Sequence, residues 1–96
     1  MNFVIVKKMF FITLAKLRGA IDEAFSKKTE QFMKNPPAGV KIHNVFYTLG
    51  RYDLAIVYEA PSEKEALIAG MTFVDKAATE TLIAIPLEEA RKLLKR

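Results

Sequence analysis

The order of two hydrophobic patterns along the chain is the feature that most constrains its fold. Segments rich in β-branched and aromatic residues, which are typical of strands, alternate with segments whose apolar residues recur at helical spacing. We predict four strands, at Asn2–Ile12, Val40–Leu49, Tyr52–Ala60 and Ala77–Ile85. We predict helices from Thr13 to Asn35 and from Ser62 to Val74, and a short final helix that Pro86 opens.

Local signals place the helix ends and the turns. Thr13 can cap the first helix, and the Asn35–Gly39 segment ends it, because proline lacks a backbone donor and disfavours helix in the preceding residue. Ser62 and Glu65 have the spacing of a capping box, which satisfies free backbone N–H groups at a helix start. Only Gly50-Arg51 separates the second and third strands, so we predict a tight β-hairpin there.

The predicted order, β-α-β-β-α-β, is that of an α+β, ferredoxin-like sandwich. Such a domain has an antiparallel four-stranded sheet with two helices on one face. Residues 1–96 form one domain of this kind, with a short C-terminal helix added. Two helices leave the other face of the sheet open, and several strand residues predicted to point there are large and apolar. We therefore expect a homodimer or a larger closed assembly, with sheet packed on sheet.

The composition excludes several kinds of chemistry. The chain has no cysteine, so it has no disulfide framework, no thiolate zinc site and no thiol nucleophile. His43 is the only histidine and belongs to no metal-binding motif. The four glycines are isolated and form no phosphate-binding loop. We expect no metal and no cofactor.

Charge does not indicate a nucleic-acid or membrane partner. The net charge is +4, and the basic residues concentrate in the first half of the chain. The longest basic pieces, Lys7-Lys8 and Lys27-Lys28, are short, and we interpret them as solvated surface. The apolar run Met9–Ala15 is too short to span a membrane, and we interpret it as the end of a strand and the start of a helix. We expect a cytoplasmic protein, which also fits the lack of cysteine.

The segment Phe46–Leu54 carries a family resemblance. It contains Gly50, Tyr52 and Asp53 in the order Gly-x-Tyr-Asp, and it resembles the hairpin of the GYD domain family. Glu59-Ala60-Pro61 and Thr79-Glu80-Thr81-Leu82 are similar to that family's third and fourth strands. The resemblance covers residues 42–85, while the first half of the chain matches in layout only. It implies a ferredoxin-like fold and oligomerisation through the sheet, as in dimeric α/β barrels, and it implies no particular reaction.

Polar residues at the predicted hairpin are candidates for a site, each with a structural alternative. Asp53 can accept hydrogen bonds from turn N–H groups and lock the hairpin, or it can stand at a cavity mouth, paired with Arg51. Tyr52 can place a phenol in a site or serve as a packed, hydrogen-bonded core residue. His43 can act as a general base or lie exposed on a strand.

Glu80 has two interpretations that depend on which way its strand faces. If Glu80 points toward the helices, its carboxylate needs a cationic partner, such as Lys7, Lys8 or Arg51. If Thr79 and Thr81 point there instead, Glu80 and Glu59 become candidates for a polar spot in a cavity between subunits. The sequence leaves both open.

These observations support a small-molecule-binding or assembly module with a site between packed sheets. The alternative is a cofactor-free enzyme of the monooxygenase or isomerase type, in which Tyr47, His43, Asp53 or Glu80 supplies acid–base chemistry. A regulatory ligand-sensing domain that acts in trans is a third possibility. The candidate ligand-binding residues are His43, Tyr47, Arg51, Tyr52, Asp53 and Glu80.

Overall fold

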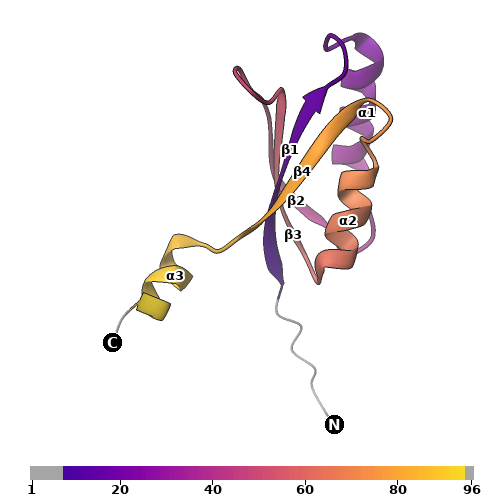
Figure 1. Cartoon of the computed structure of the whole chain (residues 1–96). Helices are drawn as coiled ribbons and strands as arrows, with labels where there is room; N and C mark the ends of the chain where they lie inside the picture. The colour runs from indigo at the N-terminus through magenta and orange to yellow at the C-terminus, as the bar shows by residue number, and fades with distance from the viewer. Residues whose placement is uncertain (1–7, 95–96) are drawn as a thin grey trace.

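The computed structural model describes residues 8–94 and has a four-stranded antiparallel sheet with the strand order β2-β3-β1-β4. The strands are β1 (Met9–Leu17), β2 (Lys41–Tyr47), β3 (Leu54–Ala60) and β4 (Ala77–Ala84). The helices are α1 (Glu23–Lys34), α2 (Glu63–Met71) and α3 (Leu87–Leu94). Figure 1 shows α1 and α2 on one side of the sheet and α3 apart from both. The ferredoxin-like order and the final helix are confirmed.

The boundary between the first strand and the first helix differs from the prediction. The predicted strand ended at Ile12 and the helix began at Thr13, but β1 continues to Leu17. Residues 11, 13, 15 and 17 are buried in alternation, which is the period of a strand and not of a helix. The helix is instead capped by Asp22, whose side chain accepts a hydrogen bond from the Phe25 amide at 2.8 Å. Residues 2–7 of the predicted strand lie outside the described residues.

The hairpin between β2 and β3 is also longer than predicted. The strands stop at Tyr47 and resume at Leu54, so six residues connect them instead of two. Gly50 adopts a φ of 104°, which a residue with a side chain rarely adopts. The loop is closed by a hydrogen bond from the Thr48 amide to the Asp53 carbonyl at 2.9 Å.

The core lies between the sheet and the helices α1 and α2. Phe73, which follows α2, joins the two helices because its ring packs against Phe25 and Phe32, with centroids 6.0 Å and 5.1 Å away. Small residues on α2, including Ala66 and Ala69, are buried and let this helix approach the sheet closely. Aromatic contacts of this kind contribute beyond the area they bury.

A buried hydrogen-bonded network crosses the centre of the sheet. The Thr13 hydroxyl on β1 contacts the Tyr58 hydroxyl on β3 at 2.8 Å and the Thr81 hydroxyl on β4 at 2.9 Å. Tyr58 is completely buried, and its hydroxyl also reaches the Ala66 carbonyl of α2 at 3.4 Å. The network therefore joins three strands and one helix, and it keeps the buried hydroxyls of Thr13 and Tyr58 paired.

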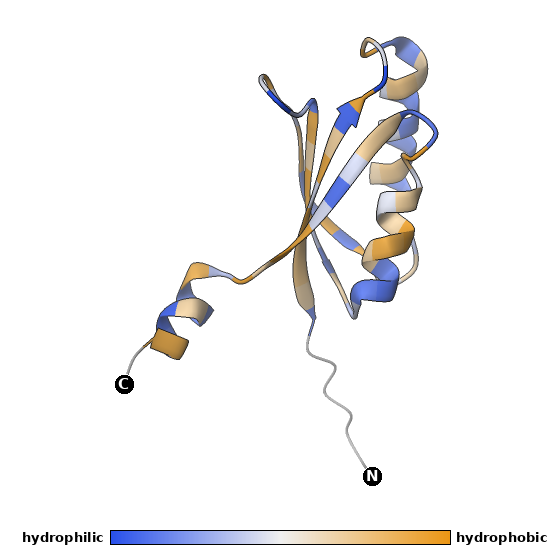
Figure 2. Ribbon diagram, viewed as in Figure 1, coloured by the Kyte–Doolittle hydropathy of each residue, from blue (hydrophilic) through white to orange (hydrophobic). Residues whose placement is uncertain are grey.

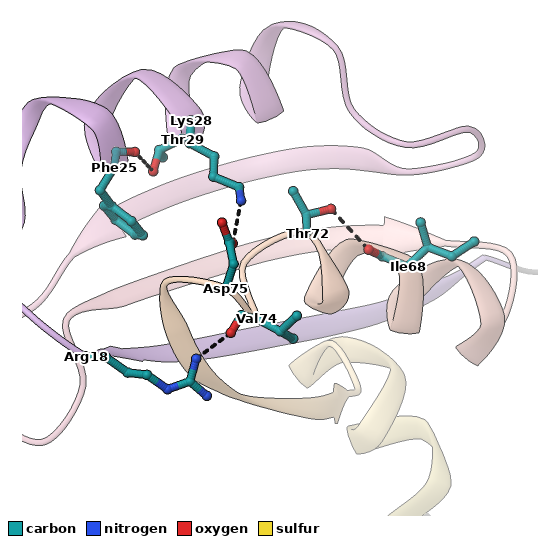
Figure 3. A network of polar contacts seen from close by, with 8 residues as sticks. All are labelled: Arg18, Phe25, Lys28, Thr29, Ile68, Thr72, Val74 and Asp75. Atoms are coloured by element: carbon teal, nitrogen blue, oxygen red, sulfur yellow. Dashed lines mark hydrogen bonds and ion pairs between the residues drawn. The ribbon is translucent and has the colours of Figure 1, made fainter.

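Side chains of α1 and of the β1–α1 connection hold the loop between α2 and β4 (Figure 3). Lys28 Nζ lies 2.5 Å from Asp75 Oδ1, and the Arg18 guanidinium donates a hydrogen bond to the Val74 carbonyl. The hydrogen bond from Lys28 holds the pKa of the Asp75 carboxyl below its usual range. Because this ion pair is exposed, it positions the loop more than it stabilises the fold.

The predicted capping box at the start of α2 is present. The Ser62 hydroxyl accepts a hydrogen bond from the Lys64 amide at 3.3 Å and donates one to Glu65 Oε2 at 2.5 Å. This hydroxyl is the main reason why the pKa of the Glu65 carboxyl lies below its ordinary value. The cap thus depends on Glu65 being ionised.

Replacing Ser62 with alanine is expected to lower the free energy of unfolding by about 1 kcal/mol, the usual value of a helix N-cap. Denaturant unfolding would measure this, with the exposed Ser26→Ala in α1 as a control that changes little. Since the folded pKa of Glu65 is lowered, the difference between wild type and Ser62→Ala should shrink as the pH falls through that pKa. A difference that stays constant down to the most acidic pH tested contradicts the proposed role of Glu65.

Candidate functional site

The face of the sheet opposite α1 and α2, here called the open face, is largely apolar. Because Phe11, Thr13 and Ala15 point toward the helices, Phe10, Ile12 and Leu14 point the other way. The strand register sets Ala55, Val57, Leu82 and Ala84 beside them, with Phe46 on β2. Phe46 and Leu82 are 52% and 41% exposed. Figure 2 shows hydrophobic residues along the middle of the strands.

The register resolves which way Glu80 points. Thr81 pairs with the buried Thr13, and Thr79 pairs with the buried Ala15, so both threonines lie on the helix side. Glu80 pairs with Leu14 and therefore lies on the open face. Of the two interpretations left by the sequence, the structure has the second, in which Glu80 and Glu59 share this face.

Polar side chains gather where the open face meets the β2–β3 loop. The Tyr52 hydroxyl donates a hydrogen bond to the Glu80 carboxylate, and Lys16 Nζ lies 3.5 Å from Asp53 Oδ2. We call these four residues the loop-end cluster. Arg51 does not pair with Asp53, because its guanidinium lies over the Tyr52 ring, 5.6 Å from the centroid.

The hydrogen bond to Glu80 decides what Tyr52 can do chemically. It raises the pKa of the Tyr52 phenol above its ordinary value, because a phenolate could not donate to the carboxylate. The phenol therefore stays protonated over the physiological pH range. In this arrangement Tyr52 can donate a hydrogen bond or a proton, and it is a poor base.

The Asp53 carboxylate binds the end of β1 and not an amide of its own turn. Its carboxylate accepts a hydrogen bond from the Leu17 amide at 2.8 Å, and its own amide donates to the Ala15 carbonyl at 2.8 Å. These two bonds tie the end of the β2–β3 loop to the end of β1. One oxygen atom, Oδ2, thus serves both the Leu17 amide and Lys16.

His43 lies at the opposite end of the open face. Its Nε2 atom is 2.5 Å from Glu59 Oε2, and its ring stacks on Phe10 with centroids 5.7 Å apart. Phe10 and Lys16 are six residues apart on β1, so the His43–Glu59 pair and the loop-end cluster are separated by about 20 Å. His43 sits at a register shift between Ile42 and Asn44, which the sequence pattern could not reveal.

Tyr47 is not part of either group. It pairs with the buried Leu54, and its ring lies 6.5 Å from that of Phe25 on α1. Tyr47 therefore lies on the helix side of the sheet, whereas the other candidates lie on the open face or in the hairpin. The structure brings together Tyr52, Asp53 and Glu80, with Arg51 beside them, and separates His43 and Tyr47 from them.

A groove between α2 and β4 was not predicted. It has a volume of about 560 Å³ and lies on the helix side, at the edge of the sheet. Its lining includes the apolar Leu67, Met71, Val74 and Ile83, with Thr79, Thr81 and Glu63 as polar members.

No metal centre is found among residues 8–94, where no three His, Asp or Glu side chains come together. In the same residues no helix is both long and apolar enough to cross a membrane. The polar groups at the open face include the neutral Tyr52 phenol, the carboxylates, His43 and Lys16. They can hold polar groups of a ligand beside an apolar surface.

A family model described as GYD domain matches residues 13–94. The match is wider than the resemblance over residues 42–85 and includes most of β1, α1 and α3. A search of curated proteins found no match.

Asp53→Ala is expected to destabilise the fold by about 1–3 kcal/mol, because it leaves the partly buried Leu17 amide without a partner. Asp53→Asn keeps an acceptor oxygen and loses only an exposed ion pair, so its cost should stay below about 1 kcal/mol. Denaturant unfolding of both variants measures the difference. Equal losses for alanine and asparagine would show that the charge, and not the hydrogen bond, matters.

Glu80→Ala is expected to bring the pKa of Tyr52 down toward about 10, since it removes the acceptor that holds the phenol protonated. Ultraviolet absorbance of phenolate during an alkaline titration measures this, and Tyr52→Phe identifies which of the three tyrosines titrates. Because the folded pKa is raised, this contact stabilises the protein below the ordinary pKa and is lost at higher pH. An unchanged titration in Glu80→Ala contradicts the assigned contact.

Proposed function

We propose that this chain, which belongs to the GYD domain family, is a homo-oligomeric module that binds a small molecule between packed sheets. The observation that carries the proposal is the open face, an apolar surface with polar groups at two ends. Two copies related by a twofold axis would each contribute the same face, which is how most soluble homodimers are built.

The apolar middle of the open face supports association. Ile12, Leu14 and Val57 lie side by side on β1 and β3, and all are partly exposed. Removing such surface from water stabilises an assembly by about 25 cal/mol for each Å² of apolar area. Leu82 on β4 extends this surface across the sheet, because it pairs with Ile12.

The loop-end cluster supports a ligand of mixed character. In a sheet-to-sheet dimer the apolar middle excludes water, and the Tyr52 phenol, Glu80 and Lys16 border that space. A ligand that fits has an apolar body and one polar group that accepts from the phenol or from Lys16, or donates to a carboxylate. Sites with few polar groups in an apolar surface are typical of small-molecule binding.

One observation favours the alternative, a cofactor-free enzyme at the same place. A phenol held protonated next to a carboxylate can donate a hydrogen bond to a substrate oxygen that gains negative charge, although its raised pKa makes Tyr52 a weaker proton donor. Mass spectrometry of an incubated ligand separates the two functions. An enzyme returns an altered molecule and loses this activity in Tyr52→Phe, whereas a binding module returns the ligand unchanged.

Native mass spectrometry of the wild type is expected to give a dimer or a larger assembly, together with any ligand carried through purification. Leu82→Lys puts a charge on the apolar part of the open face, beside Ile12, and should shift the protein to monomer, because a buried, unpaired charge is costly. Leu49→Lys is the matched control, since Leu49 is fully exposed at the hairpin tip and its replacement should change nothing.

Circular dichroism checks that Leu82→Lys remains folded, which is expected because the side chain is already part-exposed on an edge strand. A wild-type protein that is monomeric at all concentrations overturns the proposal. So does a folded Leu82→Lys variant that assembles as well as the wild type.

A further inference from the structure

The helix α3 presents an apolar stripe that no other part of residues 8–94 buries. Leu87, Ala90, Leu93 and Leu94 fall on one side of the helix at helical spacing, and the charged residues 88, 89, 91 and 92 fall on the other. None of residues 87–94 is buried, and Leu94 is 81% exposed. A helix of eight residues is marginal in water by itself, so α3 needs a surface to pack on.

The connection to β4 directs α3 away from its own groove. Only Ile85 and Pro86 separate the strand from the helix, and proline disfavours a helical backbone in the residue before it. The chain therefore continues in the direction of β4 past the end of the sheet. Figure 1 shows α3 beyond that end, on the side away from α1 and α2, and Figure 2 shows hydrophobic colour in its last turn.

The groove between α2 and β4 has the complementary character. The apolar residues along it, Leu67, Met71 and Ile83, are all more than half exposed although they adjoin the core. The stripe of α3 extends over about 12 Å, comparable to the nine-residue helix α2 that forms one wall. The apolar stripe and the apolar groove, both exposed among the described residues, would cover each other.

Charge at the edges of the two surfaces is also complementary. Glu63 lines the groove, and Arg91 flanks the apolar stripe of α3. Within its own helix Arg91 contacts Glu88 at 3.2 Å, in an exposed pair that contributes little. Breaking the Arg91–Glu88 pair so that Arg91 can pair with Glu63 of another copy therefore costs little free energy.

The size of the open face gives a reason for a second contact. Four strands of seven to nine residues have a flat area of about 500 Å² before side-chain relief is counted. A stable interface buries about 800 Å² on each partner. The area of the open face is below this value. In a twofold dimer each copy would place its α3 on the other copy, so the exchange would add two further contact areas.

We infer that α3 is an exchanged arm, which packs with its apolar stripe in the groove between α2 and β4 of a second copy of this chain. The inference rests on the proposed homo-oligomer and goes beyond it, because it assigns a second interface on the helix side of the sheet. It also assigns an occupant to the groove, which is then a protein contact and not a ligand pocket.

Chemical cross-linking tests the exchange directly, because the chain has no cysteine of its own. Leu93→Cys in α3 and Met71→Cys in the groove are combined in one chain, and a short bismaleimide is added to the assembled protein. Both positions are exposed, at 72% and 57%, so the variant should fold. The matched control combines Leu93→Cys with Leu49→Cys at the hairpin tip. Each single-cysteine variant shows how much cross-linking joins the same position of two copies.

The expected result is a shift of the band on a denaturing gel from the mass of one chain to that of two, with loss of this shift in the control. An internally linked single chain means that α3 folds onto its own groove, and it overturns the inference. A dimer by native mass spectrometry with no more linkage than the control also overturns it while leaving the sheet-packed dimer in place. A monomer by native mass spectrometry overturns both. A second pair, Leu94→Cys with Leu67→Cys, replaces the first if that variant does not fold.

Discussion

The hydrogen-bonded contact of the buried Thr13 with Tyr58 and Thr81 is the constraint on which the rest of the structure depends. The hydroxyl groups of Thr13 and Tyr58 meet inside an otherwise apolar core, and Thr81 joins them from its edge; an unpaired hydroxyl in the core would cost more than a typical hydrogen bond contributes. A shift of one residue in any of these strands would break the contact and also turn every side chain to the other face. The composition of the open face, including the position of Glu80 beside Leu14, follows from this register.

The order of elements could be predicted from sequence because each type of pattern repeats over many residues and ends at a clear signal, such as Pro36 or Ser62. The end of β1 could not, because Leu14, Leu17 and Ile21 are apolar at helical spacing while residues 11 to 17 also alternate. Burial decides between the two patterns, and burial depends on the partner strands. Asp22 was the local signal for the true helix start, since its side chain caps α1.

The contacts of the candidate site could be predicted where they join neighbours in the chain. They could not be predicted where they depend on the pairing of strands that are far apart in sequence. Tyr52 and Asp53 are neighbours in the chain, so the sequence placed them together. The contact of Tyr52 with Glu80 spans 28 residues and follows from the register of two strand pairs. His43 pairs with Glu59 across strands at a register shift in β2, and Tyr47 lies on the helix side because it comes after that shift. Periodicity read along one strand cannot show such a shift.

The irregularity in β2 also makes the two edges of the sheet unequal. On β2, the register shift at Ile42 and Asn44 interrupts the regular ladder that an added strand would need, and Lys41 places a charge there. The pairing of β4 is regular over its whole length, so its outer edge offers the better template. Pairing through one edge alone, β4 against β4, closes after two copies and leaves no free template for a third. The outer edge of β4 is thus the better of the two edges for an added strand, and a pair formed through that edge alone stops at two copies.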